Sequence, residues 1–210
     1  MKSIVIGIHL REEDVRPEAE AMKIGDLHAS VFTVDDDRPL SDRNLLLEVA
    51  AIRARLLDRA TFVAIRYGFA VRDANELASK TSAMTSRWRE LLTAHRDHVE
   101  MTLKVPALSP VSRPNRKDFA SGAEYLRALH ESSNAVDIDA AFRLQVERTL
   151  IPVAVEHRWI RDASSVELAM LVRRDDVARV NTAGEALRGK TPFLLSGPWP
   201  LEVFTDDHQQ

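Results

Sequence analysis

The chain has 210 residues, of which 45% are hydrophobic and 29% are charged, and its formal net charge is -3. This length allows one large domain or two small ones, and the hydrophobic fraction is sufficient for a buried core. Strong electrostatic binding to nucleic acid requires a basic excess, which this balance excludes. Cysteine is absent, so neither a disulfide framework nor a thiolate metal site can form.

The N-terminal apolar run is too short for a secretory signal peptide, and acidic residues follow it directly. No window approaches the roughly 20 apolar residues that a membrane-spanning helix needs. We therefore expect a cytoplasmic protein that has no membrane partner.

The first 34 residues show the patterns of strands. The β-branched run Ile4–Leu10 predicts a buried strand. Gly25-Asp26 separates two strand-like runs, 21–24 and 27–34, and this dipeptide is a turn signal. The pattern predicts a β-hairpin, and hence antiparallel pairing.

A helix, a strand and a second helix are expected next. Ser41 or Asp42 can cap the first helix. Its apolar residues recur at helical spacing: Leu45, Val49, Ile52 and Leu56, with Leu46 and Leu57 widening the stripe. A strand is expected over Thr61–Tyr67, and a long helix over Asp73–His95.

The clearest half-buried strand is Val99–Val105, where apolar and polar residues alternate. Such a strand needs a partner, and the nearest good candidates are Val166–Val172 and Pro192–Leu195, both later in the chain. This pairing predicts an N-terminal α+β domain over residues 1–95 and a C-terminal α+β domain over residues 96–210.

The rest of the second half also mixes strands and helices. Pro106–Asp118 is expected to be a loop because it is rich in proline. A helix is expected from Ile138 towards His157, kinked or ended early by Pro152. A further helix is expected over Asp175–Leu187 and a final strand over Pro192–Phe204. The fold class predicted by this succession is α+β.

The sequence holds no motif for nucleophilic, phosphate or dinucleotide chemistry. The one close histidine pair, His95 and His98, lies where a helix should end and has no third ligand nearby, so we expect no metal and no cofactor. His9 and His28 lie on neighbouring expected strands, with Asp26 close by. A base oriented by a carboxylate would show this pattern, and so would two ordinary strand histidines.

Two further features are candidates for binding another protein. Arg66, Tyr67 and Gly68 end an expected apolar strand, which suggests a strand end near a surface, although Arg66 could instead pair with an internal carboxylate while Tyr67 packs. Prolines on both sides, including Pro198, hold Trp199 rigidly. Trp199 either fills the core of its own domain or anchors a partner, as exposed aromatic residues do at interfaces.

These residues resemble the gas vesicle protein L/F family, whose members are accessory proteins of gas vesicle formation. Five segments follow the family's order along nearly the whole chain: Gly25–Val31, Val63–Gly68, Val99–Val105, Ser121–Leu126 and Ser196–Pro200. Of the family's continuation after Gly-Pro-Trp-Pro, only Phe204 is kept. The aromatic residues common in the family's first strand are replaced by Ile4, Val5 and Ile6.

The resemblance implies a non-enzymatic, two-domain accessory protein with a ferredoxin-like second domain. It also implies binding to the small hydrophobic shell protein, to other accessory proteins, or to both, in the cytoplasm and in association with gas vesicles. The candidate protein-binding residues are Arg66, Tyr67, Gly68, Pro198, Trp199 and Phe204. Two alternatives stay open: a small-molecule enzyme that uses His9, His28 and Asp26, and a minor structural component of the vesicle.

Overall fold

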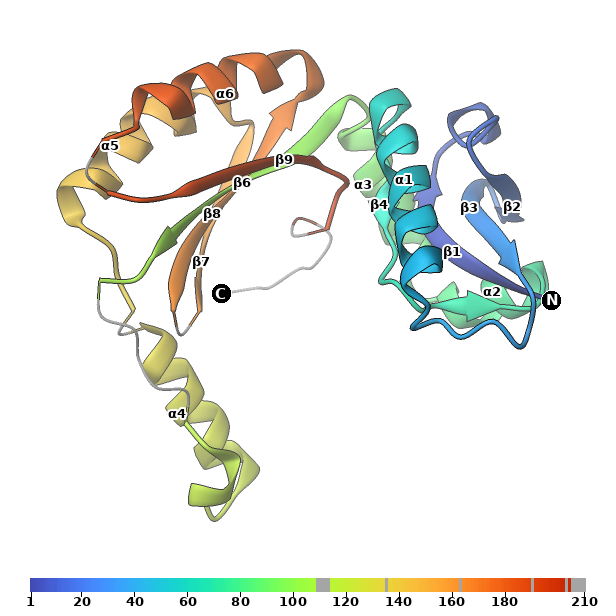
Figure 1. The fold of residues 1–210 in the computed structure, drawn as a ribbon, viewed down its shortest axis with the longest axis horizontal. Helices are drawn as coiled ribbons and strands as arrows, with labels where there is room; N and C mark the ends of the chain where they lie inside the picture. The colour runs from blue at the N-terminus through green and yellow to red at the C-terminus, as the bar shows by residue number, and fades with distance from the viewer. Residues whose placement is uncertain (109–113, 135, 163, 190, 203, 205–210) are drawn as a thin grey trace. The chain divides into compact units, whose positions relative to one another are not determined.

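A computed structural model describes residues 1–108, 114–134, 136–162, 164–189, 191–202 and 204. The chain forms two compact units (Figure 1). One consists of Met1–Val99 with the C-terminal residues from Trp199 onward, and the other of Glu100–Pro198. Each unit combines an antiparallel sheet with helices, so the predicted α+β class is confirmed. Among the described residues, no helix is long and apolar enough to cross a membrane.

The first unit is built on a five-stranded sheet of order β2-β3-β1-β4, in which β5 also pairs with β1. Its strands are β1 (Lys2–His9), β2 (Glu20–Ile24), β3 (Leu27–Val34), β4 (Val63–Ala64) and β5 (Ala70–Val71). The predicted hairpin is confirmed, because β2 and β3 pair antiparallel around Gly25-Asp26. Gly25 has a φ of 62°, a left-handed conformation that glycine adopts without steric cost.

The first long helix, α1 (Arg43–Arg59), begins where the sequence predicts. The Asp42 carboxylate accepts hydrogen bonds from the backbone N–H groups of Asn44 and Leu45, which satisfies two donors that the first turn leaves unpaired. The face that α1 buries is the predicted apolar stripe without Leu46, which is 47% exposed. Its buried residues are Leu45, Val49, Ile52, Leu56 and Leu57. A short 3-10 turn, η1 (Glu12–Asp14), follows β1.

The prediction of one helix over Asp73–His95 is wrong, because the structure has two helices there: α2 (Ala74–Thr81) and α3 (Thr85–Ala94). Hydroxyl side chains compete with the helical backbone at the break. The Thr81 hydroxyl donates to the Leu77 carbonyl oxygen at 2.8 Å, and the Thr85 hydroxyl donates to the Thr81 carbonyl oxygen at 3.0 Å. The strand predicted over Thr61–Tyr67 is also shorter, since only β4 is strand.

The second unit contains a four-stranded sheet of order β7-β8-β6-β9. Its strands are β6 (His98–Pro106), β7 (Glu156–Asp162), β8 (Ser165–Arg173) and β9 (Leu194–Trp199). The expected pairing of Val99–Val105 with later strands is confirmed, because β6 lies between β8 and β9. Helices fall between β6 and β7 and between β8 and β9. This succession is compatible with a ferredoxin-like domain, which stays a prediction.

The described residues of the second unit also form three α-helices: α4 (Gly122–Asn134), α5 (Ala140–Leu150) and α6 (Val177–Ala186). The short 3-10 turns are η2 (Arg116–Asp118), η3 (Ile151–Val153) and η4 (Arg174–Asp176). A capping box begins α4, where Ser121 and Glu124 each accept a hydrogen bond from the other's backbone N–H. In the predicted loop Pro106–Asp118, residues 109–113 lie outside the described residues.

The helix expected from Ile138 ends early, which confirms one of the two outcomes predicted at Pro152. Asp139 caps α5, which ends at Leu150, and Pro152 lies in the turn that follows. A strand, β7, then begins at Glu156. Proline cannot donate the backbone hydrogen bond that would continue the helix, so the chain is free to enter the sheet.

The two faces of the second sheet differ. Figure 1 shows α5 and α6 against one face. Alternate residues of β6 and β8 on that face join the buried core with α5 and α6: Met101, Leu103, Val105, Val166, Leu168, Met170, Phe142, Val146 and Val180. The opposite face carries polar groups, including an ion pair between Lys104 of β6 and Glu167 of β8.

The C-terminal segment packs with the first unit, whereas the sequence-based division placed it in residues 96–210. The Leu201 backbone N–H donates to the Phe62 carbonyl oxygen at 2.9 Å, and the Ala64 N–H donates to the Leu201 carbonyl oxygen at 3.0 Å. These bonds place Leu201 beside β4 as an isolated parallel bridge with Val63. Backbone pairing with β4 therefore accounts for this difference between the predicted and the observed ranges.

Candidate functional site

The three residues of the enzymatic alternative lie in the first unit, but they do not converge on a site. His9 of β1 and His28 of β3 are directly opposite each other across the sheet. His9 is 0% exposed, and its Nε2 lies 3.0 Å from the Ser30 hydroxyl oxygen, which donates to the Gly7 carbonyl oxygen. The Asp26 carboxylate instead pairs with Arg89. Within the part of the chain that the structure describes, no carboxylate accepts a hydrogen bond from His9.

The surroundings of His9 keep its imidazole neutral. Burial lowers the pKa of His9 to about 4, with a smaller opposing effect from Asp14 and a further lowering effect from His28. Its ring stacks on that of Phe62, with 5.0 Å between the centroids. A buried, neutral ring packed in this way is typical of a core histidine rather than a general base that reaches a substrate.

We expect the free energy of unfolding to fall by roughly 3 kcal/mol as pH decreases from about 6.5 to about 4, through His9 alone. The sign follows from the lowered pKa: the unfolded chain takes up the proton first, so this contribution is present above the unfolded pKa and is lost on acidification. Urea denaturation at several pH values measures it. In His9→Gln this part of the pH dependence should disappear, and in the control His28→Gln it should remain. An equal acid slope in wild type and His9→Gln would contradict the prediction.

Arg66, Tyr67 and Gly68 lie in a turn that follows β4. The Phe69 backbone N–H donates to the Arg66 carbonyl oxygen at 3.3 Å and closes this turn. The Tyr67 hydroxyl donates to the Leu40 carbonyl oxygen at 2.7 Å, so the phenol is held against the protein. Of the three residues, Arg66 is therefore the one that is exposed at the surface.

The candidates near the C-terminus differ sharply in exposure. The Trp199 side chain is 48% exposed, whereas the Phe204 side chain is 2% exposed. One of the two alternatives from the sequence, that Trp199 fills the core, is therefore wrong. The buried aromatic residue of this segment is Phe204. Pairing of Leu201 with β4 brings this segment close to the strand that precedes Arg66. Pro198 is half-buried and belongs to the second unit.

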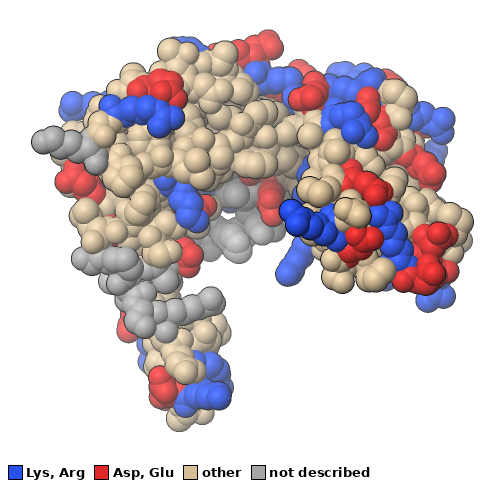
Figure 2. Space-filling model, viewed as in Figure 1, with Lys and Arg blue, Asp and Glu red and all other residues tan. Residues whose placement is uncertain are grey.

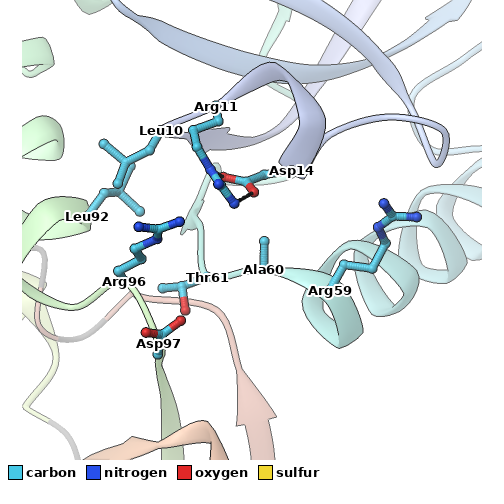
Figure 3. Close-up of a pocket in the computed structure, with 9 residues that line it drawn as sticks. All are labelled: Leu10, Arg11, Asp14, Arg59, Ala60, Thr61, Leu92, Arg96 and Asp97. Atoms are coloured by element: carbon cyan, nitrogen blue, oxygen red, sulfur yellow. Dashed lines mark hydrogen bonds and ion pairs between the residues drawn. The ribbon is translucent and has the colours of Figure 1, made fainter.

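A polar pocket of about 80 Å³ lies in the first unit (Figure 3). Its lining comes from the end of β1, η1 and the ends of α1 and α3: Leu10, Arg11, Asp14, Arg59, Ala60, Thr61, Leu92, Arg96 and Asp97. Arg11 forms an ion pair with Asp14 at 2.6 Å, and Figure 3 shows Arg96 extending toward the same space. The Thr61 hydroxyl is already engaged, because it donates to the His98 carbonyl oxygen at 2.7 Å.

The chemistry of the polar pocket is that of exposed ion pairs. Its lining includes neither His9 nor His28, and it offers no hydroxyl or thiol activated by a base. The volume suits a few water molecules or one small polar group. None of the sequence-predicted site residues lines it, and no local sequence signal could have found it, because its residues come from three separate stretches of the sequence, 10–14, 59–61 and 92–97.

An apolar groove of about 280 Å³ lies in the second unit. Its lining comes from the ends of β6, β8 and β9 and the turns beside them: Lys104, Pro106, Ser164, Ser165, Pro192, Phe193 and Leu194. Leu194 is 62% exposed. Lys104 pairs with Glu167, so its charge is compensated at the rim of the groove. The sequence analysis did not identify this groove, although it placed Pro192–Leu195 in a strand.

Charged side chains form no surface of a single sign in the view of Figure 2. Lysines and arginines lie close to aspartates and glutamates over the first unit, and a broad area over the second unit has few charges. This distribution agrees with the small net charge of the chain. Within the described ranges, no group of three or more His, Asp or Glu side chains could hold a metal ion. His95 and His98 meet only edge to face, with 5.4 Å between ring centroids.

The comparisons with known proteins agree with one another. The family model for gas vesicle synthesis protein GvpL/GvpF matches residues 14–204. The crystal structure of gas vesicle protein GvpF from Anabaena sp. PCC7120 is similar with a TM-score of 0.68 and 11% identity, over 98% of each chain. That of GvpF from Microcystis aeruginosa has a TM-score of 0.69 and 11% identity, over 98% of this chain and 99% of that one. No significant match is found among curated proteins.

Proposed function

We propose, from the fact that the chain belongs to the gas vesicle synthesis protein GvpL/GvpF family, that it is a non-enzymatic accessory protein which binds the small hydrophobic shell protein during vesicle assembly. Membership of this family gives the protein a role in gas vesicle formation. The binding partner, the place of action in the cytoplasm and an association with the vesicle are parts of the proposal.

The observation that carries the proposal is the apolar groove of the second unit. A shell subunit that packs into a gas-filled wall must carry apolar surface, and such surface aggregates unless a partner covers it. The groove is open and apolar, with Pro106, Phe193 and Leu194 in its lining. Catalysis would instead favour a pocket lined by reactive side chains, and His9 is buried in the sheet.

The direct test is co-expression of the chain with the shell protein of the same organism. We expect the shell protein to stay in the soluble fraction and to co-purify with the chain. A shell protein that is equally insoluble with and without the chain would refute this function. The ratio of chain to shell protein in purified vesicles separates the two non-enzymatic roles. An assembly factor should be present in far smaller amounts than the shell protein, whereas a structural component should be present in amounts near those of the shell protein.

Trp199 is the proposed aromatic anchor in the first unit. Because its side chain is 48% exposed, Trp199→Ala should change the free energy of unfolding by less than about 1 kcal/mol. Loss of an interface aromatic should weaken partner binding by roughly tenfold or more. Urea denaturation and a binding titration measure the two effects.

The matched control is Leu47→Ala, which removes an exposed apolar side chain of α1 in the same unit. We expect Leu47→Ala to leave both stability and binding nearly unchanged. If Trp199→Ala binds the partner as tightly as Leu47→Ala does, Trp199 is not an anchor. Arg66, whose side chain is exposed, is the second residue of the first unit to test in this way.

A further inference from the structure

The two edges of the sheet in the second unit have different compositions. One edge strand, β7, carries five charged or titratable residues out of seven: Glu156, His157, Arg158, Arg161 and Asp162. The other edge strand, β9, has the sequence Leu-Leu-Ser-Gly-Pro-Trp and carries none. Charged side chains on an edge strand oppose pairing with another chain. By this criterion β7 is protected against strand addition and β9 is not.

Two prolines delimit the accessible part of the β9 edge. Pro192 precedes the strand and Pro198 lies near its end. Proline has no backbone N–H to donate and is tolerated at sheet edges for that reason. In the described sheet, β9 pairs with β6 and with no other strand. Of the five residues between these prolines, Phe193 and Leu194 line the apolar groove and Leu195 follows them, so Phe193–Leu195 is the stretch at which we expect a further strand to form backbone hydrogen bonds.

The side chains of this stretch point alternately toward the core and toward the groove. Leu195 packs against the second core, and its Cδ2 would lie 2.4 Å from a Cβ on Gly184 of α6. Phe193 also packs against this core, where its ring centroid lies 5.8 Å from that of Phe142. Leu194, which lies between Phe193 and Leu195 in the chain, is 62% exposed and lines the apolar groove. The groove thus extends over the ends of β6 and β8 and reaches β9 at Leu194, where a strand added at this edge can place an apolar side chain in it.

We propose that the β9 edge, at Phe193–Leu195, accepts an extended, uncharged, apolar segment of the shell protein as an additional strand, with one of its side chains in the apolar groove. This inference rests on the proposed function. Open backbone donors and acceptors select an extended segment, as in other cases of strand addition. Absence of charge along β9 selects an uncharged one, because a charged side chain would lose hydration against Leu194. Lys104, the charged residue of the groove lining, is already paired with Glu167.

Hydrogen exchange on the complex of the full chain with the shell protein tests the backbone pairing. Backbone amides within Phe193–Leu195 that point away from β6 should exchange at least roughly tenfold more slowly in the complex than in the free chain. Unchanged exchange along β9 in a complex that does form would overturn the inference and leave the proposed function standing. The result would then indicate a partner that covers the groove by its side chains alone.

Binding titrations of two matched variants test the position. Leu194→Lys puts a charge at the groove and should weaken binding of the shell protein by at least roughly tenfold. Ile160→Lys is the control, because it adds the same charge at β7, the opposite edge of the same sheet. Ile160 is 38% exposed and lies opposite Glu167, which pairs with Lys104 of the groove lining. The control should bind within about twofold of wild type. Thermal melts should show both variants folded.

The remaining outcomes are also decisive. Equal binding of Leu194→Lys and wild type overturns the inference but not the proposed function. Absence of any binding by the wild-type chain overturns both. A second copy of the chain would be the occupant if, without shell protein, exchange along β9 slows as the concentration of the chain rises and sedimentation shows dimers. This result would overturn the assignment to the shell protein.

Discussion

Replacing Gly197 with alanine should lower the free energy of unfolding by roughly 2–5 kcal/mol, from backbone strain and overpacking together. Gly197 has a φ of 126°, in a region that residues with a Cβ rarely adopt. An added Cβ would lie 2.7 Å from the Met101 Sδ and 2.9 Å from the Glu100 carbonyl oxygen. Met101 is fully buried, so neither β6 nor its core can move aside cheaply.

Urea denaturation, followed by circular dichroism, measures this loss. Gly122→Ala is the control in the same unit, because the nearest atom to its added Cβ is the Arg116 Nη2 at 4.0 Å. We expect Gly122→Ala to stay within about 0.5 kcal/mol of wild type. A Gly197→Ala variant as stable as that control would show that β9 does not approach β6 as closely as the structure has it.

Truncation of Phe204 should cost roughly 3–5 kcal/mol, the range measured for phenylalanine side chains removed from cores. The side chain of Phe204 is 2% exposed, and Leu201, three residues earlier, is tied to β4 by two backbone hydrogen bonds. The C-terminal segment is thus part of the core of the first unit. Chemical denaturation of Phe204→Ala measures the cost.

Trp199→Ala is the natural comparison for Phe204→Ala, since both remove a large aromatic side chain from one short segment. The exposed residue should affect binding and the buried one should affect stability. Weaker partner binding without loss of stability in Phe204→Ala would contradict the burial and would favour the direct binding role that the resemblance implies for this residue.

The elements that were predicted well are those whose signals are local. Turn chemistry at Gly25-Asp26 located the hairpin, and a side-chain cap at Asp42 located the start of α1. Alternation in Val99–Val105 identified β6 and its need for partners later in the chain. The single helix expected over Asp73–His95 was wrong because hydroxyl groups near Thr81 compete with the helical backbone. At Pro152 an early end of the helix was expected, but the edge strand β7 that follows was not.

The candidate site was only partly predictable. Of the tyrosine and tryptophan singled out in the sequence, Trp199 ends β9 and Tyr67 lies in the turn between β4 and β5. Their roles depend on what surrounds them. Tyr67 is held by the carbonyl of Leu40, a residue 27 positions away. The apolar groove joins residues near 104, 165 and 193, and the polar pocket joins residues near 12, 60 and 95. No periodicity links positions so far apart, because such neighbours are created by sheet pairing.

By itself, the amino-acid sequence determined the α+β class, the principal hairpin, the central strand of the second sheet and the resemblance to gas vesicle proteins. All of these depend on local periodicity, turn residues and the order of short motifs. Only the tertiary structure decided that Trp199 is exposed while Phe204 is buried, and that the C-terminal segment packs beside β4. The physical reason is that burial of a side chain depends on the surfaces that the rest of the chain brings to it, and two aromatic residues five positions apart can meet entirely different surfaces.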